Sequence, residues 1–183
     1  MPIEPEFHKK LFPNSLLRGE KLSKDEVTNP TSYALENVYI SFAGQTENSK
    51  LAKVGDIMLI YRKGNTEPKH FSSVVTTAII ITDIFRSFNN IDDFLSKVEN
   101  RSVFTKKELE LFYVKQKDKI VIVKFVLISA LSKKVTLEKL RKLNIIEPFA
   151  GPRPFAKIND KQFNIILSEA KTEVKFSKVD ENE

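Results

Sequence analysis

The sequence predicts an α+β fold in which a small mixed β-barrel has helices packed at its side or end. Two observations lead to this prediction. Short segments rich in β-branched and aromatic residues recur between polar intervals, as is typical of paired strands. Segments with apolar residues at helical spacing also recur, each preceded by a residue that commonly begins a helix. The predicted order is three strands, then helices, then a strand and a helix.

The chain of 183 residues suits one domain, since domains commonly run to roughly 100–200 residues. Residues 1–30 are expected to form an extended lead-in, because prolines interrupt the start of the chain. A capping box at Ser23–Glu26 predicts one brief helical turn there. Residues 31–170 would form the barrel domain, and residues 171–183 a C-terminal strand or tail.

The first strands are predicted on either side of a polar loop. Val38–Phe42 is β-branched and aromatic, which favours a strand. Residues 43–53 are polar and predict a loop. Gly55-Asp56 then turns the chain into a second strand, Ile57–Arg62.

Two longer apolar runs complete the predicted sheet. The run Phe71–Ile84 is too long for one flat strand, so a bend or bulge is expected near Thr76-Thr77. Lys119–Ser129 is apolar almost throughout, which suits a strand buried on both faces. Within it, Lys124 is expected to extend its charged end to solvent or to lie at an edge. Val174–Val179 is expected to be a terminal edge strand or to fray.

Start signals predict four helices, and each is followed by apolar residues on one helical face. The predicted helices begin at Asn90, Thr105, Thr136 and Asn159. The second and fourth have the residues of a capping box, with Glu108 and Gln162 at the third helical position.

The charge balance favours an anionic partner. The 30 lysines and arginines exceed the 24 acidic residues by six, and the isoelectric point is near 9.3. Nucleic acid is the commonest partner of such a surface. The alternative is a lysine-rich surface that serves only solubility.

Composition argues against several other classes of protein. Without cysteine the chain has no disulfide, thiolate metal ligand or cysteine nucleophile. Its two histidines have no clustered ligand set, so neither a metal nor a cofactor is expected. No apolar run approaches the roughly 18–20 residues of a membrane span, and the first residues lack a secretory signal pattern. We therefore expect a cytoplasmic protein that does not contact membranes.

The Gly-Asp strand at Val54–Tyr61, followed by a strand at Ser73–Ile80, resembles the PUA-like superfamily, which includes PUA, ASCH and EVE domains. The segment Arg101–Thr105, which leads into a helix, is similar to the PUA-like region appended to some bacterial GNAT-type acetyltransferases. The Gly-x-Lys-x-x-Glu-x-Arg motif expected of ASCH proteins is not found, so the resemblance does not extend to ASCH chemistry.

The resemblance implies a barrel that binds RNA, or a modified base or nucleotide, in a groove beside the barrel. Because no catalytic motif such as Gly-x-Ser-x-Gly is present, we expect a binding module without activity of its own. One alternative is a regulatory or interaction domain detached from a GNAT-type acetyltransferase, which could be a linked partner. The acetyl-CoA pyrophosphate loop of that enzyme is missing, and a modified-nucleoside hydrolase is a further alternative.

The candidate ligand-binding residues are basic or hydroxyl side chains that could hold phosphates or base edges. They are Arg62, Ser73, Thr76, Thr77, Arg101, Lys139, Arg141, Lys142 and Arg153. Each has a structural alternative: Arg101 as a helix C-terminal cation, the hydroxyls as strand formers, and the lysines as a solvated helix face. Phe155 could contact a base beside Arg153 or could anchor its loop to the core.

Overall fold

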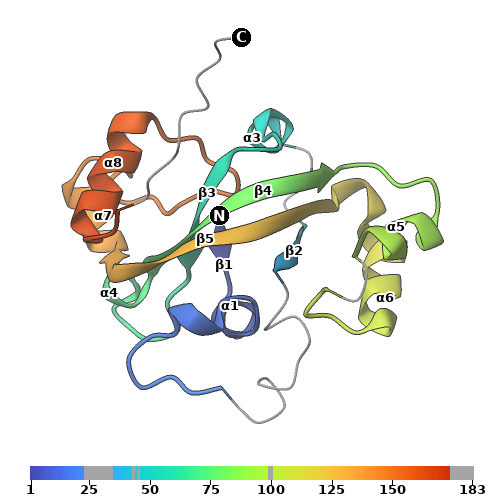
Figure 1. The fold of residues 1–183 in the computed structure, drawn as a ribbon, viewed down its shortest axis with the longest axis horizontal. Helices are drawn as coiled ribbons and strands as arrows, with labels where there is room; N and C mark the ends of the chain where they lie inside the picture. The colour runs from blue at the N-terminus through green and yellow to red at the C-terminus, as the bar shows by residue number, and fades with distance from the viewer. Residues whose placement is uncertain (23–34, 43, 45, 99–100, 174–183) are drawn as a thin grey trace.

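The computed structural model describes residues 1–22, 35–42, 44, 46–98 and 101–173. Their centre is a five-stranded mixed sheet that curls into a half-barrel (Figure 1). Its order is β1 (Pro2–Ile3), β3 (Ile57–Arg62), β4 (Val74–Phe85), β5 (Val121–Thr136) and β2 (Glu36–Ser41). The β1–β3 pair is parallel and the other pairs are antiparallel. The predicted α+β pseudobarrel is confirmed.

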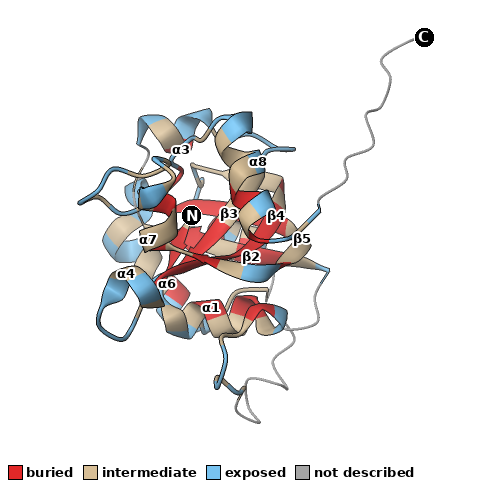
Figure 2. Ribbon diagram, turned by 90° about the vertical axis from the view of Figure 1, so that its left-hand side faces the viewer, coloured by how far each residue is buried: buried red, intermediate tan, exposed pale blue. Residues whose placement is uncertain are grey.

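Helices cover both faces and both ends of this sheet (Figures 1 and 2). They are α1 (Pro5–Leu11), α3 (Glu47–Leu51), α4 (Lys69–Ser72), α5 (Ile91–Val98), α6 (Lys106–Gln116), α7 (Leu137–Lys142) and α8 (Asp160–Glu169), with 3-10 turns at Pro13–Ser15 and Lys117–Lys119. In Figure 2, α1 lies on one side of the strands, and α3 and α8 lie on the other. None of the helices in the described ranges is long and apolar enough to cross a membrane.

The long antiparallel pair of β4 and β5 forms the centre of the sheet. Its register shifts between Val75 and Thr77, which confirms the bulge predicted near Thr76. β5 begins as the doubly buried strand that was expected, with Val121 and Val123 fully buried. It is longer than predicted because it stays paired with β4 as far as Thr136.

The four predicted helix starts are confirmed by their cap hydrogen bonds. Thr105 with Glu108, and Asn159 with Gln162, form reciprocal capping boxes. The Thr136 hydroxyl accepts from the backbone N–H of Lys139, and the Asn90 side chain accepts from that of Asp93. Each bond satisfies a backbone donor that the first helical turn leaves free.

Three segments differ from the expectation. Phe71 and Ser72, predicted as the start of a strand, instead end the short helix α4, and β4 begins at Val74. Residues 5–11 form α1 rather than an extended lead-in, because Pro5 stands at the first helical turn, where proline fits. This helix is held by burial of Leu11, with Phe12 just after it, against β3, β4 and β5. Residues 47–51 of the predicted loop form α3, capped by the Thr46 hydroxyl. The predictions for Ser23–Glu26 and Val174–Val179 concern residues outside the described ranges.

Candidate ligand-binding cavity

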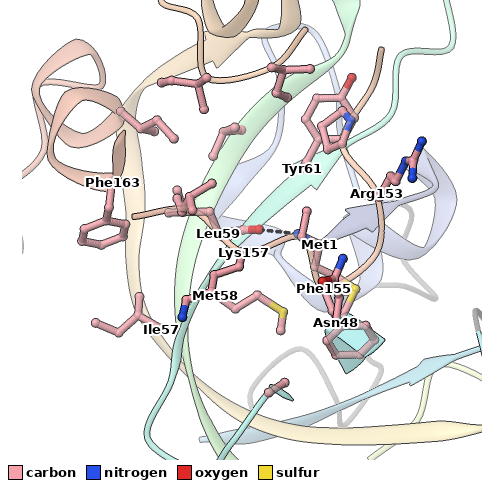
Figure 3. A pocket seen from close by; sticks show the side chains of 18 of the residues that line it. Met1, Asn48, Ile57, Met58, Leu59, Tyr61, Arg153, Phe155, Lys157 and Phe163 are labelled. Atoms are coloured by element: carbon pink, nitrogen blue, oxygen red, sulfur yellow. Dashed lines mark hydrogen bonds between the residues drawn. The ribbon is translucent and has the colours of Figure 1, made fainter. Parts of the chain in front are cut away.

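A cavity of about 830 Å³ lies between the β3 side of the sheet and the C-terminal part of the chain (Figure 3). One wall comes from α3 and the turn that follows it, and β3 forms the floor. The opposite wall is the segment from Ile145 to Ile158, together with the start of α8. Segments far apart in the sequence therefore meet around one concave space.

The interior of the cavity is mainly apolar and aromatic. Met58 and Leu59 of β3 line it beside Tyr61, Phe155 and Phe163. Phe155 is buried against Ile81, Val121 and Val123, so it anchors its loop to the core as well as lining the cavity. The ring of Phe163, on α8, is only partly buried.

Tyr61 and the chain start contribute polar groups near this interior. Burial raises the pKa of the Tyr61 phenol, while its hydrogen bond to Ser73 and the positive charges of Arg141 and Lys63 oppose the rise. The amino group of Met1 donates a 2.7 Å hydrogen bond to the Leu59 carbonyl (Figure 3). Because its pKa is raised, Tyr61 offers a neutral hydroxyl at pH 7.

Charged residues of both signs lie around the mouth of the cavity. The cations are Lys53, Arg153 and Lys157, and the anions are Asp56, Glu147 and Asp160. The three cations are exposed, and within the described ranges their side chains form no ion pair. Asp56 accepts from the backbone N–H of Lys53, so part of its hydrogen-bonding capacity is used within the turn.

Each of the two opposite walls is held in place by the hydrogen bonds of one arginine. Arg86, which follows β4, donates from Nε and Nη2 to the Ser49 carbonyl (3.2 and 2.6 Å) and from Nη2 to the Ala52 carbonyl (2.6 Å). Arg141 of α7 donates from Nε and Nη2 to the Ala150 carbonyl (3.1 and 2.7 Å). A guanidinium suits this role because its donors form a rigid fork.

Of the nine basic and hydroxyl candidates, only Arg153 is in the cavity lining, where the predicted aromatic residue Phe155 also lies. Arg141 is outside the lining, and it holds the wall formed by residues 145–158 through its bonds to the Ala150 carbonyl. The other helix cations are paired: Lys139 with Glu169 (3.1 Å) and Lys142 with Glu138 (2.8 Å).

Arg101 lies elsewhere, in the segment between α5 and α6. Its guanidinium forms an ion pair with Glu36 of β2. The neighbouring ring of Phe104 packs on Phe7 of α1, with 5.0 Å between the centroids. Arg101 is thus at a contact between elements rather than beside the cavity.

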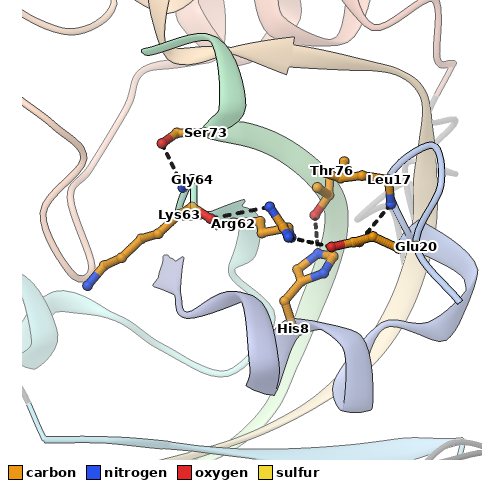
Figure 4. A network of polar contacts seen from close by, with 8 residues as sticks. All are labelled: His8, Leu17, Glu20, Arg62, Lys63, Gly64, Ser73 and Thr76. Atoms are coloured by element: carbon orange, nitrogen blue, oxygen red, sulfur yellow. Dashed lines mark hydrogen bonds and ion pairs between the residues drawn. The ribbon is translucent and has the colours of Figure 1, made fainter. Parts of the chain in front are cut away.

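The predicted hydroxyl residues and Arg62 belong to a buried polar network (Figure 4). The Ser73 Oγ accepts from the backbone N–H of Gly64 at 2.8 Å. Arg62 pairs with Glu20 and donates to the Lys63 carbonyl. These side chains are engaged inside the protein, so no face of theirs is open to a ligand.

Thr76, Thr77 and their partners join the sheet to the N-terminal segment. The Thr76 Oγ1 is 2.8 Å from His8 Nε2, and the Thr77 Oγ1 is 2.7 Å from the Ser15 Oγ. Burial, followed by the charges of Arg62 and Lys134, lowers the pKa of His8 to about 3. His8 is therefore a neutral structural residue at pH 7.

Sequence reasoning missed Lys53, Lys157 and Phe163 as cavity residues. Lys53 stands two residues before Gly55 of the Gly-Asp turn, and Lys157 stands two residues before Asn159, the N-cap of α8. That position, at the junction of a loop and a regular element, is the signal that could have drawn attention to them. Among the described residues, no group of three or more His, Asp or Glu side chains could hold a metal ion.

No protein-family model matches the sequence, and no curated protein matches it. The fold, with its curled sheet and flanking helices, is that of a PUA-like pseudobarrel of the ASCH type. Solved structures similar to this chain include those of an ASCH protein from Zymomonas mobilis, in its unmutated form and in two point-mutant forms. They superpose with a TM-score of 0.57 over 92% of this chain and 92–94% of theirs, at 11–12% sequence identity. At this identity the likeness shows the fold alone.

Proposed function

We propose that the protein is a binding module whose cavity takes a phosphorylated ligand with a planar ring: a nucleotide, or an unpaired base of RNA. The observation that carries the proposal is the combination of an aromatic interior with exposed cations at the mouth, Arg153 and Lys157. It occurs in a PUA-like pseudobarrel, and the sequence resemblance to that superfamily implies a ligand of this kind.

The dimensions and chemistry of the cavity support this choice. Its volume of about 830 Å³ is within the range of roughly 300–1,000 Å³ that small-molecule sites occupy. A base could stack on the partly exposed ring of Phe163, since stacking on aromatic side chains is the usual means of holding an unpaired base. The Tyr61 hydroxyl could bond a base edge.

The charge pattern favours few phosphate contacts. Arg153, Lys157 and Lys53 are available at the mouth, whereas Lys139 and Lys142 are paired with glutamates. The acidic residues on the same rim would repel a ligand with many phosphates. A short single strand or one nucleotide therefore fits better than a duplex.

The test is a fluorescence-anisotropy titration of the full chain with single-stranded and structured RNA at two salt concentrations. Arg153→Ala and Lys157→Ala should each weaken binding and lower the dependence of log K on log salt by about 0.7, the share of one phosphate contact on a single strand. Lys139→Ala is the matched control, because it removes a paired cation outside the lining. Absence of binding by the unmutated chain at low salt would refute the proposal.

The resemblance of Arg101–Thr105 to the region beside GNAT-type acetyltransferases supports a second candidate, a regulatory domain that acts with such an enzyme. Arg101 is engaged with Glu36, and the Thr105 cap begins α6, so this segment supports an interaction role more than a ligand site. An acetyltransferase reading frame joined to this one in the genome would favour the second candidate.

A further inference from the structure

The most exposed large apolar side chain in the described part of the protein is next to the cavity. Phe149 is 99% exposed, although burying a phenylalanine side chain commonly contributes about 1.5–3 kcal/mol to folding. Glu147, two residues before it, and Ala150, the residue after it, both line the cavity. Phe149 itself is not in the lining, so its ring lies beyond the cavity space.

A turn holds Phe149 in this exposed position. The backbone N–H of Ala150 donates to the Glu147 carbonyl at 3.1 Å, which places Pro148 and Phe149 at the two central positions of a β-turn. Proline favours the first of these positions because its φ is already fixed. The Ala150 carbonyl is also the acceptor for Arg141. The ring is therefore carried on an anchored turn at the edge of the cavity.

The other aromatic residue of this segment has a different role. Phe155 is only 6% exposed and packs on Ile81, Val121 and Val123. It cannot turn outward without leaving the core. Of the two phenylalanines in the 145–158 segment, Phe149 is thus the one whose whole ring surface is available to a partner.

We propose that Phe149 stacks on a base next to the one held in the cavity, so that the preferred ligand is single-stranded RNA longer than one nucleotide. This inference rests on the proposed function of the cavity. Stacking of a base on an exposed aromatic ring is sequence-tolerant and is worth about 1–3 kcal/mol, or about 5- to 150-fold in affinity. The mononucleotide would occupy the cavity without reaching the turn.

The first test compares two probes on two variants. Random-sequence single-stranded RNA pentamers and the four ribonucleoside monophosphates are titrated into the unmutated chain, Phe149→Ala and Val114→Ala. Val114 is the matched control, because it is an exposed apolar residue (76%) on α6, which does not contribute to the lining. Phe149→Ala should bind the pentamers at least five-fold more weakly and the monophosphates as before, and Val114→Ala should match the unmutated chain.

The second test uses the absence of tryptophan from the chain. Phe149→Trp makes that position the sole tryptophan, so stacking can be followed directly by fluorescence quenching. Pentamers should quench Trp fluorescence in this variant and monophosphates should not, whereas a Val114→Trp variant should respond to neither. Circular dichroism of each variant checks that the fold is kept.

The outcomes separate the two proposals. If the unmutated chain binds neither probe, the proposed function fails and this inference fails with it. If the chain binds pentamers but Phe149→Ala binds them equally well and Phe149→Trp is not quenched, only the role of Phe149 is overturned. If Phe149→Ala weakens the binding of both probes equally, the proposed role of Phe149 is likewise overturned, since the ring would then act on the cavity itself.

Discussion

The guanidinium of Arg141 and the carbonyl of Ala150 join α7 to the wall of the cavity through two hydrogen bonds, at 3.1 and 2.7 Å. Arg86 makes the corresponding attachment on the opposite side, to Ser49 and Ala52. One wall is a helix of five residues with the turn after it, and the other is mainly an irregular segment. Such walls keep their shape only if side-chain bonds hold them, because short helices and loops have few backbone bonds of their own.

Replacing Arg141 with alanine should weaken ligand binding without removing a ligand contact. The variant loses two charge-assisted hydrogen bonds, which predicts a loss of about 1–3 kcal/mol of stability and a several-fold weaker affinity. The salt dependence of binding should stay as in the unmutated chain. Arg141→Lys should recover part of the loss, since an ammonium can still donate to Ala150. A fall of about 0.7 in the salt slope would instead make Arg141 a phosphate contact.

Replacing Arg86 with alanine should loosen α3. Hydrogen exchange followed by mass spectrometry should show faster exchange in residues 47–56 and unchanged exchange in residues 145–158. Arg141→Ala should give the reverse pattern, so each variant is the control for the other. Equal acceleration in both segments would contradict two separate attachments.

The ion pair of Arg62 with Glu20 predicts a large loss on truncation of the acid. Their side chains are 1% and 14% exposed, and Glu20→Ala leaves the arginine buried without its counter-charge. Denaturant unfolding should show a loss on the order of 3–5 kcal/mol. Glu67→Ala, which removes the partner of Lys69 in an exposed pair, should cost little. Similar losses for both variants would contradict the role of burial.

The lowered pKa of His8 predicts acid sensitivity. In the unfolded chain this imidazole has its ordinary pKa near 6.5, whereas in the folded protein its pKa is about 3. Between these values the unfolded state binds more protons, so stability falls as pH drops from about 6.5 toward 3 and is fully kept above 6.5. The contribution of one such group approaches 1.4 kcal/mol per pH unit.

Urea unfolding at pH 7 and pH 4.5 checks this prediction. His8→Gln should lose stability at pH 7, through its contact with Thr76, and should show a smaller further loss at pH 4.5 than the unmutated chain. His70→Gln, at a partly exposed position on α4, is the control for loss of an imidazole. An unchanged pH dependence in His8→Gln would show that other groups cause the acid sensitivity.

The sequence by itself determined the α+β class, the longer strands and the four capped helices. Local signals placed the helix starts at Thr105, Thr136 and Asn159, because a cap is a bond between residues three positions apart. The bulge near Thr76 followed from the length of one apolar run. The prediction failed at Pro5, because a proline is compatible both with extended chain and with the first turn of a helix. The sequence predicts extended chain there, whereas Pro5 begins α1.

Only the tertiary structure decided which candidate side chains meet a ligand. Arg62, Thr76 and Thr77 look in sequence like polar strand residues, but all three are buried. Thr76 and Thr77 contact α1 and the turn after it, and Arg62 pairs with Glu20. Arg153 and Lys53 are a hundred positions apart and line one cavity. The reason is physical: burial and charge pairing depend on which distant segments pack together, and the type of a side chain does not reveal which segments those are.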